Sequence, residues 1–245
     1  MNPVMQTMLN HRSVRNYQDR PIDPQLFEQI LRCGQAASSS SFIQAYSVIR
    51  VTDADSRKRI ASAAGEQAWI IEAAEFLVLC ADLQRIEYAC DKNRAGALQG
   101  YTEHFIAATV DTALMAQNIL LAAESAGLGG VFIGGIRNDP ERVSDCLQLP
   151  QQVDPAFGLC LGWPAQQPEQ KPRLPLPAIL HEDEYRQQDL RQQVDDYDQV
   201  VARYYRQRGS QARLSNWSQQ TAQAIQGKNR EHMLPFLQAR GFLQR

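Results

Sequence analysis

Two basic clusters, far apart in the sequence, carry side chains that could bind a phosphate. The first is residues 11–15, His-Arg-Ser-Val-Arg, and the second is residues 171–173, Lys-Pro-Arg. Arginine and lysine supply charge-assisted hydrogen-bond donors and serine adds a hydroxyl donor, a combination that suits a phosphate dianion. The two clusters therefore predict a phosphate site assembled from distant parts of the chain.

A glycine-rich turn lies between the clusters, in residues 132–138 (Phe-Ile-Gly-Gly-Ile-Arg-Asn). Because glycine has no Cβ, Gly134 and Gly135 would let a flat ligand approach bare backbone. A flat ring joined to a phosphate describes FMN, and we interpret the three segments as a site for that molecule. Each segment alone also fits a simpler structure: a solvated loop, a strand-to-helix turn, or a basic piece of a proline-rich linker.

Motifs typical of other kinds of site are absent from the sequence. It contains no Gly-x-x-x-x-Gly-Lys-Ser/Thr, no Gly-x-Ser-x-Gly and no His-Glu-x-x-His. The glycines from 127 to 135 do not form the Gly-x-Gly-x-x-Gly of dinucleotide-binding folds. The four histidines lack ligand spacing and the five cysteines form no Cys-x-x-Cys, so we expect no metal site.

The composition is that of an ordinary soluble protein. The chain has 245 residues, 44% of them hydrophobic, and a net charge of -2, which gives no basic surface for nucleic acid or an anionic membrane. The N-terminus does not resemble a signal peptide, and no stretch is expected to span a bilayer, because polar residues interrupt the most apolar one, residues 105–123. Scattered cysteines fit a cytoplasmic location.

The elements that must position these residues are helices and short strands, which together predict an α+β fold with helices dominant. Asp23 and Pro24 begin a clear helix that Gly34 ends. Further helices are expected at 3–10, 56–64, 104–125, from 139, and at 190–206, 215–226 and 230–239. Strands are expected at 47–51, 75–81, 131–133 and 157–161. Residues 83–100 have no clear pattern, and five prolines make residues 164–177 extended and irregular.

These motifs, in this order, resemble those of the FMN-dependent nitroreductase family over essentially the whole chain. The resemblance is closest to bacterial oxygen-insensitive NADPH nitroreductases and NADPH-flavin oxidoreductases. Beyond the clusters and the glycine turn, it rests on residues 38–44, 73–76, 110–118, 122–125, 127–131, 159–162, 174–175 and 208–210. It implies a nitroreductase-like fold: a central mixed or antiparallel sheet, surrounding helices, and an intertwined homodimer with two FMN sites at the subunit interface.

The resemblance also implies that two parts of the chain have different functions. Residues 1–180 would form the FMN-binding core, and residues 181–245 a helical extension that wraps the core and contributes to NADPH binding. The positions that match those holding the FMN phosphate are His11, Arg12, Ser13, Lys171 and Arg173. The other matched cofactor contacts are Arg15 and Gln67 near the ribityl chain or the polar edge of the ring, Ser39, Ser41, and Phe132, Ile133, Gly134 and Gly135 beside the ring, where a backbone N–H can reach it.

Arg208 and Arg213 match loop positions that meet the extra phosphate of NADPH, although a solvated basic tail is an equal alternative on sequence alone. The implied reaction is two-electron, ping-pong hydride transfer from NADPH through FMN to nitroaromatic compounds and quinones, with flavin and chromate as further acceptors. Because the flavin supplies the chemistry, no classical catalytic residue is expected. Two alternatives stay open: a reductase that supplies free reduced FMN, and a flavin-binding protein without efficient turnover. The roles of Trp69 and residues 85–100 are not fixed.

Overall fold

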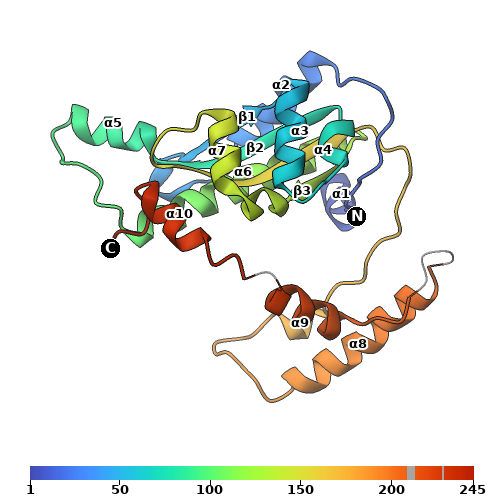
Figure 1. Ribbon diagram of the computed structural model, residues 1–245. Helices are drawn as coiled ribbons and strands as arrows, with labels where there is room; N and C mark the ends of the chain where they lie inside the picture. Colours follow the sequence, from blue (N-terminus) through green and yellow to red (C-terminus); the bar gives the residue numbers. More distant parts are fainter. Residues whose placement is uncertain (209–212, 228) are drawn as a thin grey trace. The chain divides into compact units, whose positions relative to one another are not determined.

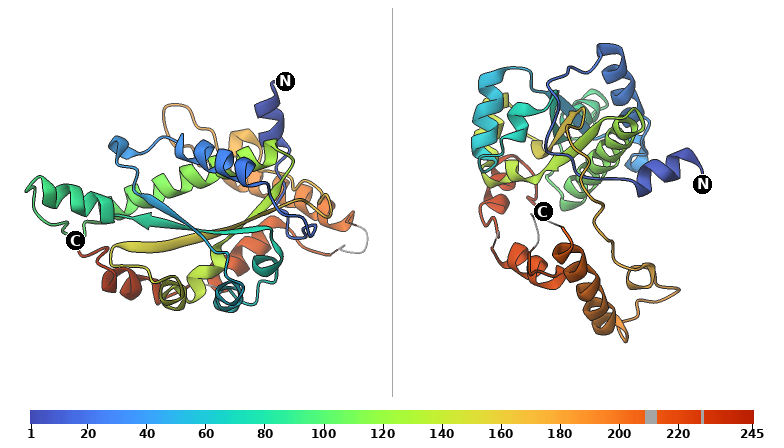
Figure 2. Two further views of the ribbon diagram at one scale, coloured as in Figure 1. Left: turned by 90° about the horizontal axis from the view of Figure 1, so that it is seen from above. Right: turned by 90° about the vertical axis from the view of Figure 1, so that its right-hand side faces the viewer.

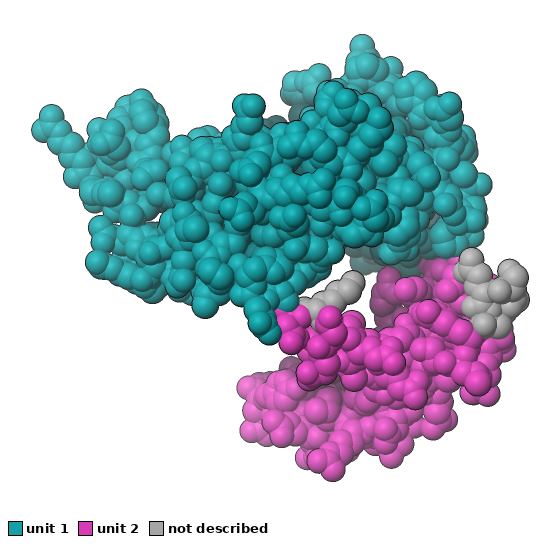
Figure 3. Space-filling view, in the orientation of Figure 1, with its two compact units in different colours: residues 1–168, 230–245 teal, residues 169–229 magenta. Residues whose placement is uncertain are grey.

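The computed structural model describes residues 1–208, 213–227 and 229–245. The chain divides into two compact units, drawn in teal and magenta in Figure 3. Unit 1 comprises Met1–Pro168 and Arg230–Arg245, and unit 2 comprises Glu169–Asn229. Compared with the expected division at residue 180, unit 2 begins earlier, at Glu169, and residues 230–245 belong to unit 1. The division into FMN-binding and NADPH-binding parts stays a prediction.

Unit 1 is built on a four-stranded sheet in which every neighbouring pair is antiparallel, with the order β1-β2-β4-β3. The strands are β1 (Tyr46–Arg50), β2 (Glu75–Asp82), β3 (Gly129–Ile133) and β4 (Val153–Gly162). The central strands β2 and β4 are almost completely buried. The apolar runs at residues 76–81 of β2 and 157–161 of β4 reflect this burial on both faces. The expected α+β fold with a central sheet is confirmed.

Helices cover both faces of this sheet, as the left view of Figure 2 shows edge-on. On one face, α2 (Pro24–Gln35) and α6 (Thr102–Ser125) pack against Leu77, Leu79 and Leu159. On the other, α3 (Ala54–Ala63), α4 (Trp69–Glu72) and α7 (Pro140–Leu147) pack against alternate residues of the same strands, such as Phe76 and Val78. The period-2 alternation of side chains along the strands therefore divides the core into two layers.

Helix α6 corrects one expectation. We expected no stretch long and apolar enough to span a bilayer, yet α6 has the length and composition to do so. In the fold it packs against the sheet through Met115, Ile119 and Leu120, and it buries Asp111 and Thr112 completely. The same criterion is met by the central helix of a soluble protein, and α6 occupies that position here.

The remaining elements of unit 1 are short. They are α1 (Pro3–Leu9), α5 (Gln84–Lys92), α10 (Met233–Ala239) and two 3-10 turns, η1 (Ser40–Phe42) and η2 (Gly134–Asn138) (Figure 1). Helix α5 lies in residues 83–100, for which the sequence predicted no element. The C-terminal residues Leu237 and Phe242 join a third apolar cluster with Ala81 and Ala108. The end of the chain is therefore part of the unit 1 core.

Unit 2 contains η3 (Leu176–Ala178), α8 (Leu190–Arg206) and α9 (Trp217–Gly227). Its small core consists of Tyr197, Val201 and Tyr205, with Leu174 and Trp217 packed against them. The expected helices at 190–206 and 215–226 are confirmed. Residues 164–177 were expected to be extended and irregular; residues 164–175 contain no helix or strand, whereas residues 176 and 177 belong to the 3-10 turn η3.

Candidate functional site

The first basic cluster lies alongside strand β3. Ser13 forms an isolated parallel bridge with Gly130, and the Val14 backbone N–H donates to the Gly130 carbonyl at 3.0 Å. At its other end, β3 leads directly into Gly134 of η2. One strand therefore joins the predicted phosphate cluster to the predicted ring-binding turn, over roughly 13 Å at the usual rise per residue. That arrangement suits a ring linked to a phosphate through a chain.

His11 is oriented by a carboxylate from the core helix. Its Nδ1 lies 2.6 Å from Oε1 of Glu124, whose side chain is only 11% exposed. The carboxylate accepts the Nδ1–H, which fixes the ring direction and leaves Nε2 to face a ligand. Glu124 lies in the last turn of α6, so the centre of the fold positions a residue of the N-terminal cluster.

Arg12 presents a buried donor. Its Nη1 donates to the Asn10 carbonyl at 3.1 Å, whereas its Nε is buried and has no partner among the residues that the structure describes. A cavity of about 420 Å³ adjoins it, lined also by Glu124, Gly129 and Pro164. Leaving a buried guanidinium N–H without an acceptor is costly. The donor set thus fits an anion such as the phosphate of FMN.

Arg15, Gln67 and Gly135 are brought together through Trp69. The Arg15 guanidinium lies 5.7 Å from the Trp69 ring centroid, and the Trp69 Nε1 donates to Gln67 Oε1 at 3.1 Å. A Cβ on Gly135 would lie 2.1 Å from Gln67 Nε2 and 2.4 Å from the Ala64 carbonyl oxygen. Glycine is therefore required at position 135 by close packing, and Trp69 links the two sets of predicted residues.

Residues 132–134 differ in which of their groups a ligand could reach. Phe132 is 38% exposed and packs edge-on against Phe157, with 5.5 Å between the ring centroids. Ile133 is 1% exposed and points into the core, so its backbone rather than its side chain is available to a ligand. Gly134 begins η2, and its carbonyl accepts from Arg230 Nη2 at 3.1 Å.

Ser39 and Ser41 lie elsewhere in the unit. They precede β1, which is at the opposite edge of the sheet from β3. Three strand spacings separate these edges, or about 14 Å, so a single chain does not bring the two serines to the Gly134 turn. The buried Asp111 of α6 fixes this loop. Its carboxylate accepts hydrogen bonds from the backbone N–H groups of Ser40 and Ala45 at 2.7 and 3.2 Å.

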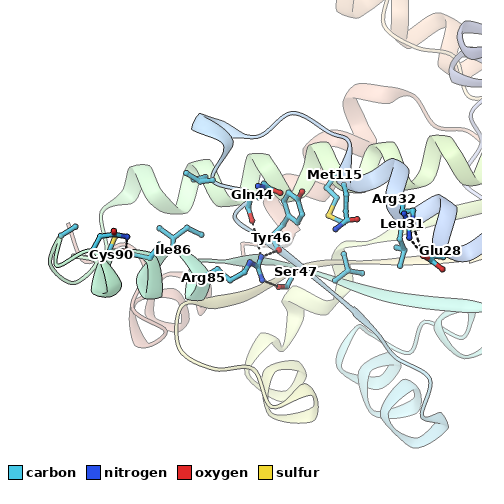
Figure 4. A pocket seen from close by; sticks show the side chains of 16 residues that line it. Glu28, Leu31, Arg32, Gln44, Tyr46, Ser47, Arg85, Ile86, Cys90 and Met115 are labelled. Carbon is cyan, nitrogen blue, oxygen red and sulfur yellow. Dashed lines mark hydrogen bonds and ion pairs between the residues drawn. The ribbon is translucent and has the colours of Figure 1, made fainter.

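The largest cavity described in unit 1, about 1180 Å³, lies beside this serine loop (Figure 4). Gln44, Tyr46 and Met115 help to line it, but none of the predicted site residues does. Arg85 also lines it, and its guanidinium is already bonded to the Tyr46 carbonyl, Ser47 Oγ and Asp82. The cavity therefore does not have the unpartnered cationic donor that marks the Arg12 site.

In unit 2, predicted cations gather around Tyr205. The Arg213 guanidinium lies 4.2 Å from the Tyr205 ring centroid, and that of Arg208 lies 5.9 Å from it. Lys171 and Tyr205 line one cavity of about 280 Å³. Burial raises the pKa of Tyr205, but the hydrogen bond with Arg213 and the charges of Lys171 and Arg213 outweigh it and lower the pKa. These cations therefore create a positive field suited to a phosphate.

Arg173 is exposed, and its Nη1 donates to the Lys171 carbonyl at 3.0 Å. It therefore stays next to Lys171, as its place in the basic cluster suggests. Residues 209 and 210, which contributed to the resemblance, lie outside the described residues.

Two residues that the sequence did not single out, Arg230 and His232, contact η2, and Arg137 within η2 makes a further contact to β4. Arg230 bonds to both Gly134 and Asn138, and His232 Nε2 donates to the Arg137 carbonyl at 2.9 Å. Arg137 Nη1 donates to the Ala156 carbonyl at 2.5 Å. Burial, together with the nearby Arg230 charge, lowers the pKa of Arg137. Arg230 and Gly134 are 96 positions apart, so no local spacing could reveal this contact.

The comparisons with known proteins agree with this geometry. The model "Nitroreductase family" matches residues 8–163, and "Nitroreductase family, C-terminal domain" matches residues 171–245. The NADPH-flavin oxidoreductase of Vibrio harveyi is 44% identical, and the oxygen-insensitive NADPH nitroreductase of Salmonella typhimurium is 42% identical; both matches cover 100% of each chain. The crystal structure of nitroreductase A from Vibrio parahaemolyticus superposes with a TM-score of 0.91 at 45% identity, covering 100% of both chains. The chain belongs to the nitroreductase family, as its motifs predicted.

Proposed function

We propose that the chain is an NADPH-dependent FMN oxidoreductase that reduces nitroaromatic compounds and quinones by two-electron, ping-pong hydride transfer. The observation that carries this proposal is the single strand β3, which joins Arg12, whose buried Nε has no partner among the described residues, to the close-packed Gly134-Gly135 turn. The names of the full-length relatives, an NADPH-flavin oxidoreductase and an NADPH nitroreductase, support the same activity.

His11, Arg12 and Ser13 would hold the FMN phosphate, with Lys171 and Arg173 as the further phosphate contacts. Charge-assisted bonds contribute roughly 1.5–3 kcal/mol each, so several together retain the cofactor without a covalent link. Arg15 and Gln67 would contact the ribityl chain or the polar edge of the ring, and the backbone of residues 132–135 would lie beside the ring. When bound, FMN supplies the hydride chemistry, and the protein supplies binding and orientation.

A homodimer would complete this site. Ser39 and Ser41 are predicted cofactor contacts, yet within one chain they lie at the opposite sheet edge from Gly134. Helix α6 also exposes Ile106, Val110 and Leu114, which are four residues apart and share one face. Such an apolar stripe is typical of a protein interface. These observations support a second copy whose serine loop reaches the first copy's flavin, and light scattering of the purified protein tests the dimer.

The cations around Tyr205 support binding of the extra phosphate of NADPH by Arg208 and Arg213. We expect the enzyme in the cytoplasm, where its five free cysteines stay reduced. A reductase that releases free reduced FMN would use the same residues, so it remains the second candidate. The electron acceptors would be small, flat and electron-poor, with flavin and chromate among them.

An anaerobic absorbance titration tests the proposal. NADPH should bleach the flavin band at about 450 nm much faster than NADH, and a nitroaromatic compound should restore it. Turnover of nitrofurazone compared with turnover of free FMN separates the two candidate reductases. A protein that stays colourless after reconstitution with FMN would contradict both of them.

A further inference from the structure

The chain segment that returns to unit 1 makes its first contacts with η2. The Arg230 guanidinium donates from Nη2 to the Gly134 carbonyl at 3.1 Å, and from Nε and Nη2 to Asn138 Oδ1 at 3.1 and 2.9 Å. Gly134 and Asn138 are the first and last residues of η2. One planar side chain therefore clamps both ends of the turn, which a lysine could not do with the same geometry.

A second contact from the same segment supports this clamp. His232, two positions after Arg230, donates from Nε2 to the carbonyl of Arg137, which also belongs to η2. On its other side the turn is packed tightly, since Gln67 Nε2 and the Ala64 carbonyl occupy the space that a Cβ on Gly135 would need. The Gly134-Gly135 peptide is thus held between bonded groups on one side and close packing on the other.

The bond to Gly134 has an electronic consequence for the next residue. The Gly134 carbonyl and the Gly135 N–H belong to one trans peptide, so they point in opposite directions. A cation that bonds to the carbonyl polarises the peptide and strengthens the N–H as a donor. Arg230 therefore acts on the strength and direction of the Gly135 N–H through the Gly134 carbonyl.

We propose that Arg230 is a positioning residue for the flavin: it fixes and polarises the Gly134-Gly135 peptide so that this peptide stabilises the more negative, reduced form of the bound ring. The proposal rests on the proposed function and assigns a role in it to a residue outside the predicted site. It requires that replacing Arg230 change the midpoint potential of the bound flavin while the protein still folds and binds FMN.

The test compares holoprotein variants by FMN affinity and by midpoint potential, measured in anaerobic titrations against a reference dye. Arg230→Gln should reduce the preference for reduced flavin about tenfold, which lowers the two-electron midpoint potential by about 30 mV. Arg230→Lys retains the charge and should recover part of that shift. Asn138→Ala removes the other end of the clamp without touching Arg230, so it should give a smaller shift in the same direction.

Arg240→Lys is the matched control. Arg240 lies in the same C-terminal segment and likewise donates to backbone carbonyls, those of Leu149, Pro150 and Val153, but not to η2. Its potential should equal that of the wild type. Unchanged potentials in Arg230→Gln and Asn138→Ala, or an equal shift in Arg240→Lys, would overturn the inference while leaving the proposed function intact. A wild-type chain that binds no FMN would overturn the proposed function itself.

Discussion

His11 and Glu124, which are 113 positions apart, meet through a contact of 2.6 Å between the imidazole Nδ1 and the carboxylate Oε1. Glu124 comes from the end of the long core helix α6, and His11 from the cluster that would bind phosphate. A helix of the unit 1 core therefore sets the direction of a ring in the N-terminal segment. Donors that are held in place lose less side-chain entropy when they bind a ligand.

Replacing Glu124 by alanine removes the acceptor that orients His11. We expect FMN affinity to fall roughly tenfold to hundredfold, since a hydrogen bond to a charged group contributes about 1.5–3 kcal/mol. Glu124→Gln keeps an acceptor and should lose less. Fluorescence titration of the apoprotein with FMN measures both, with Glu28→Gln as control because Glu28 is an exposed partner of Arg32. Wild-type affinity in Glu124→Ala would contradict a role for this contact in the phosphate site.

Arg12→Met should separate cofactor binding from stability. The variant loses charge-assisted donors, so FMN affinity should fall by roughly tenfold to hundredfold. The apoprotein should be as stable as the wild type or more stable, because the substitution removes a buried Nε that has no partner among the described residues. Urea unfolding with and without FMN measures both quantities. A strongly destabilised apoprotein would instead indicate that Arg12 has a structural role.

Much of the fold was predictable because local rules decide it. Asp23 accepts from the Gln25 and Leu26 backbone N–H groups and Pro24 occupies the first position of α2, as the sequence indicated. The apolar run of β2 is buried along its whole length. In contrast, α5 is short and largely polar and fully buries none of its residues, although Ile86 packs partly against the third apolar cluster.

The first half of β4 was not predicted from the sequence, for a different reason. Asp154 and Pro155 are unusual in a central strand, and the sequence therefore predicted a strand only from Phe157. A register shift between Leu79 and Cys80 of β2 accommodates this part of β4: Leu79 pairs with Phe157, and Cys80 pairs with Pro155. Such irregularities depend on a partner strand and leave no local signal.

The resemblance predicted residues for the site, and these assignments stay predictions; it did not indicate which residues contact them in the fold. Glu124, Asp111 and Arg230 each act across 66 or more positions in sequence. No characteristic sequence separation links these residues to His11, Ser40 or Gly134, because only the packed fold brings them together. The same holds for Trp69, which the sequence marked without fixing its role.

Gly135→Ala should disturb the turn directly. The new Cβ would overlap Gln67 Nε2 and the Ala64 carbonyl, and the carbonyl belongs to rigid backbone. We expect a loss of about 1–3 kcal/mol in stability, typical of overpacking, together with weaker FMN binding. Gly227→Ala is a suitable control because no heavy atom lies within 4 Å of its added Cβ. Thermal unfolding and FMN titration provide the readouts, and equal behaviour of the two variants would argue against the close packing at Gly135.

Arg213→Ala should change cofactor choice rather than overall activity. Arg213 lies over Tyr205 and shares the Gln220 Oε1 acceptor with its hydroxyl. If it meets the extra phosphate, kcat/KM for NADPH should fall about tenfold or more, from the loss of a charge-assisted bond. The value for NADH should change little. Arg203→Ala, an exposed arginine of α8, is the control; parallel losses with both cofactors would point to a structural effect.

Asp154 should make stability depend on pH. Its carboxyl is almost fully buried in β4, and burial raises its pKa to about 6, although Arg137 and Arg240 act in the opposite direction. The ordinary value is 3.8, so between these two values the folded chain keeps a proton that the unfolded chain has lost. Stability contributed by this group therefore falls as pH rises from about 4 through 6.

Asp154→Asn removes that titration while keeping a similar shape. A difference of about two pKa units corresponds to about 3 kcal/mol, so the free energy of unfolding of the variant relative to wild type should rise by up to that amount between pH 4 and pH 7. Urea unfolding of the apoproteins at both pH values measures the change. Asp91→Asn, at an exposed position of α5, is the control substitution. A relative stability of Asp154→Asn that is independent of pH would contradict preferential protonation of Asp154 in the folded state.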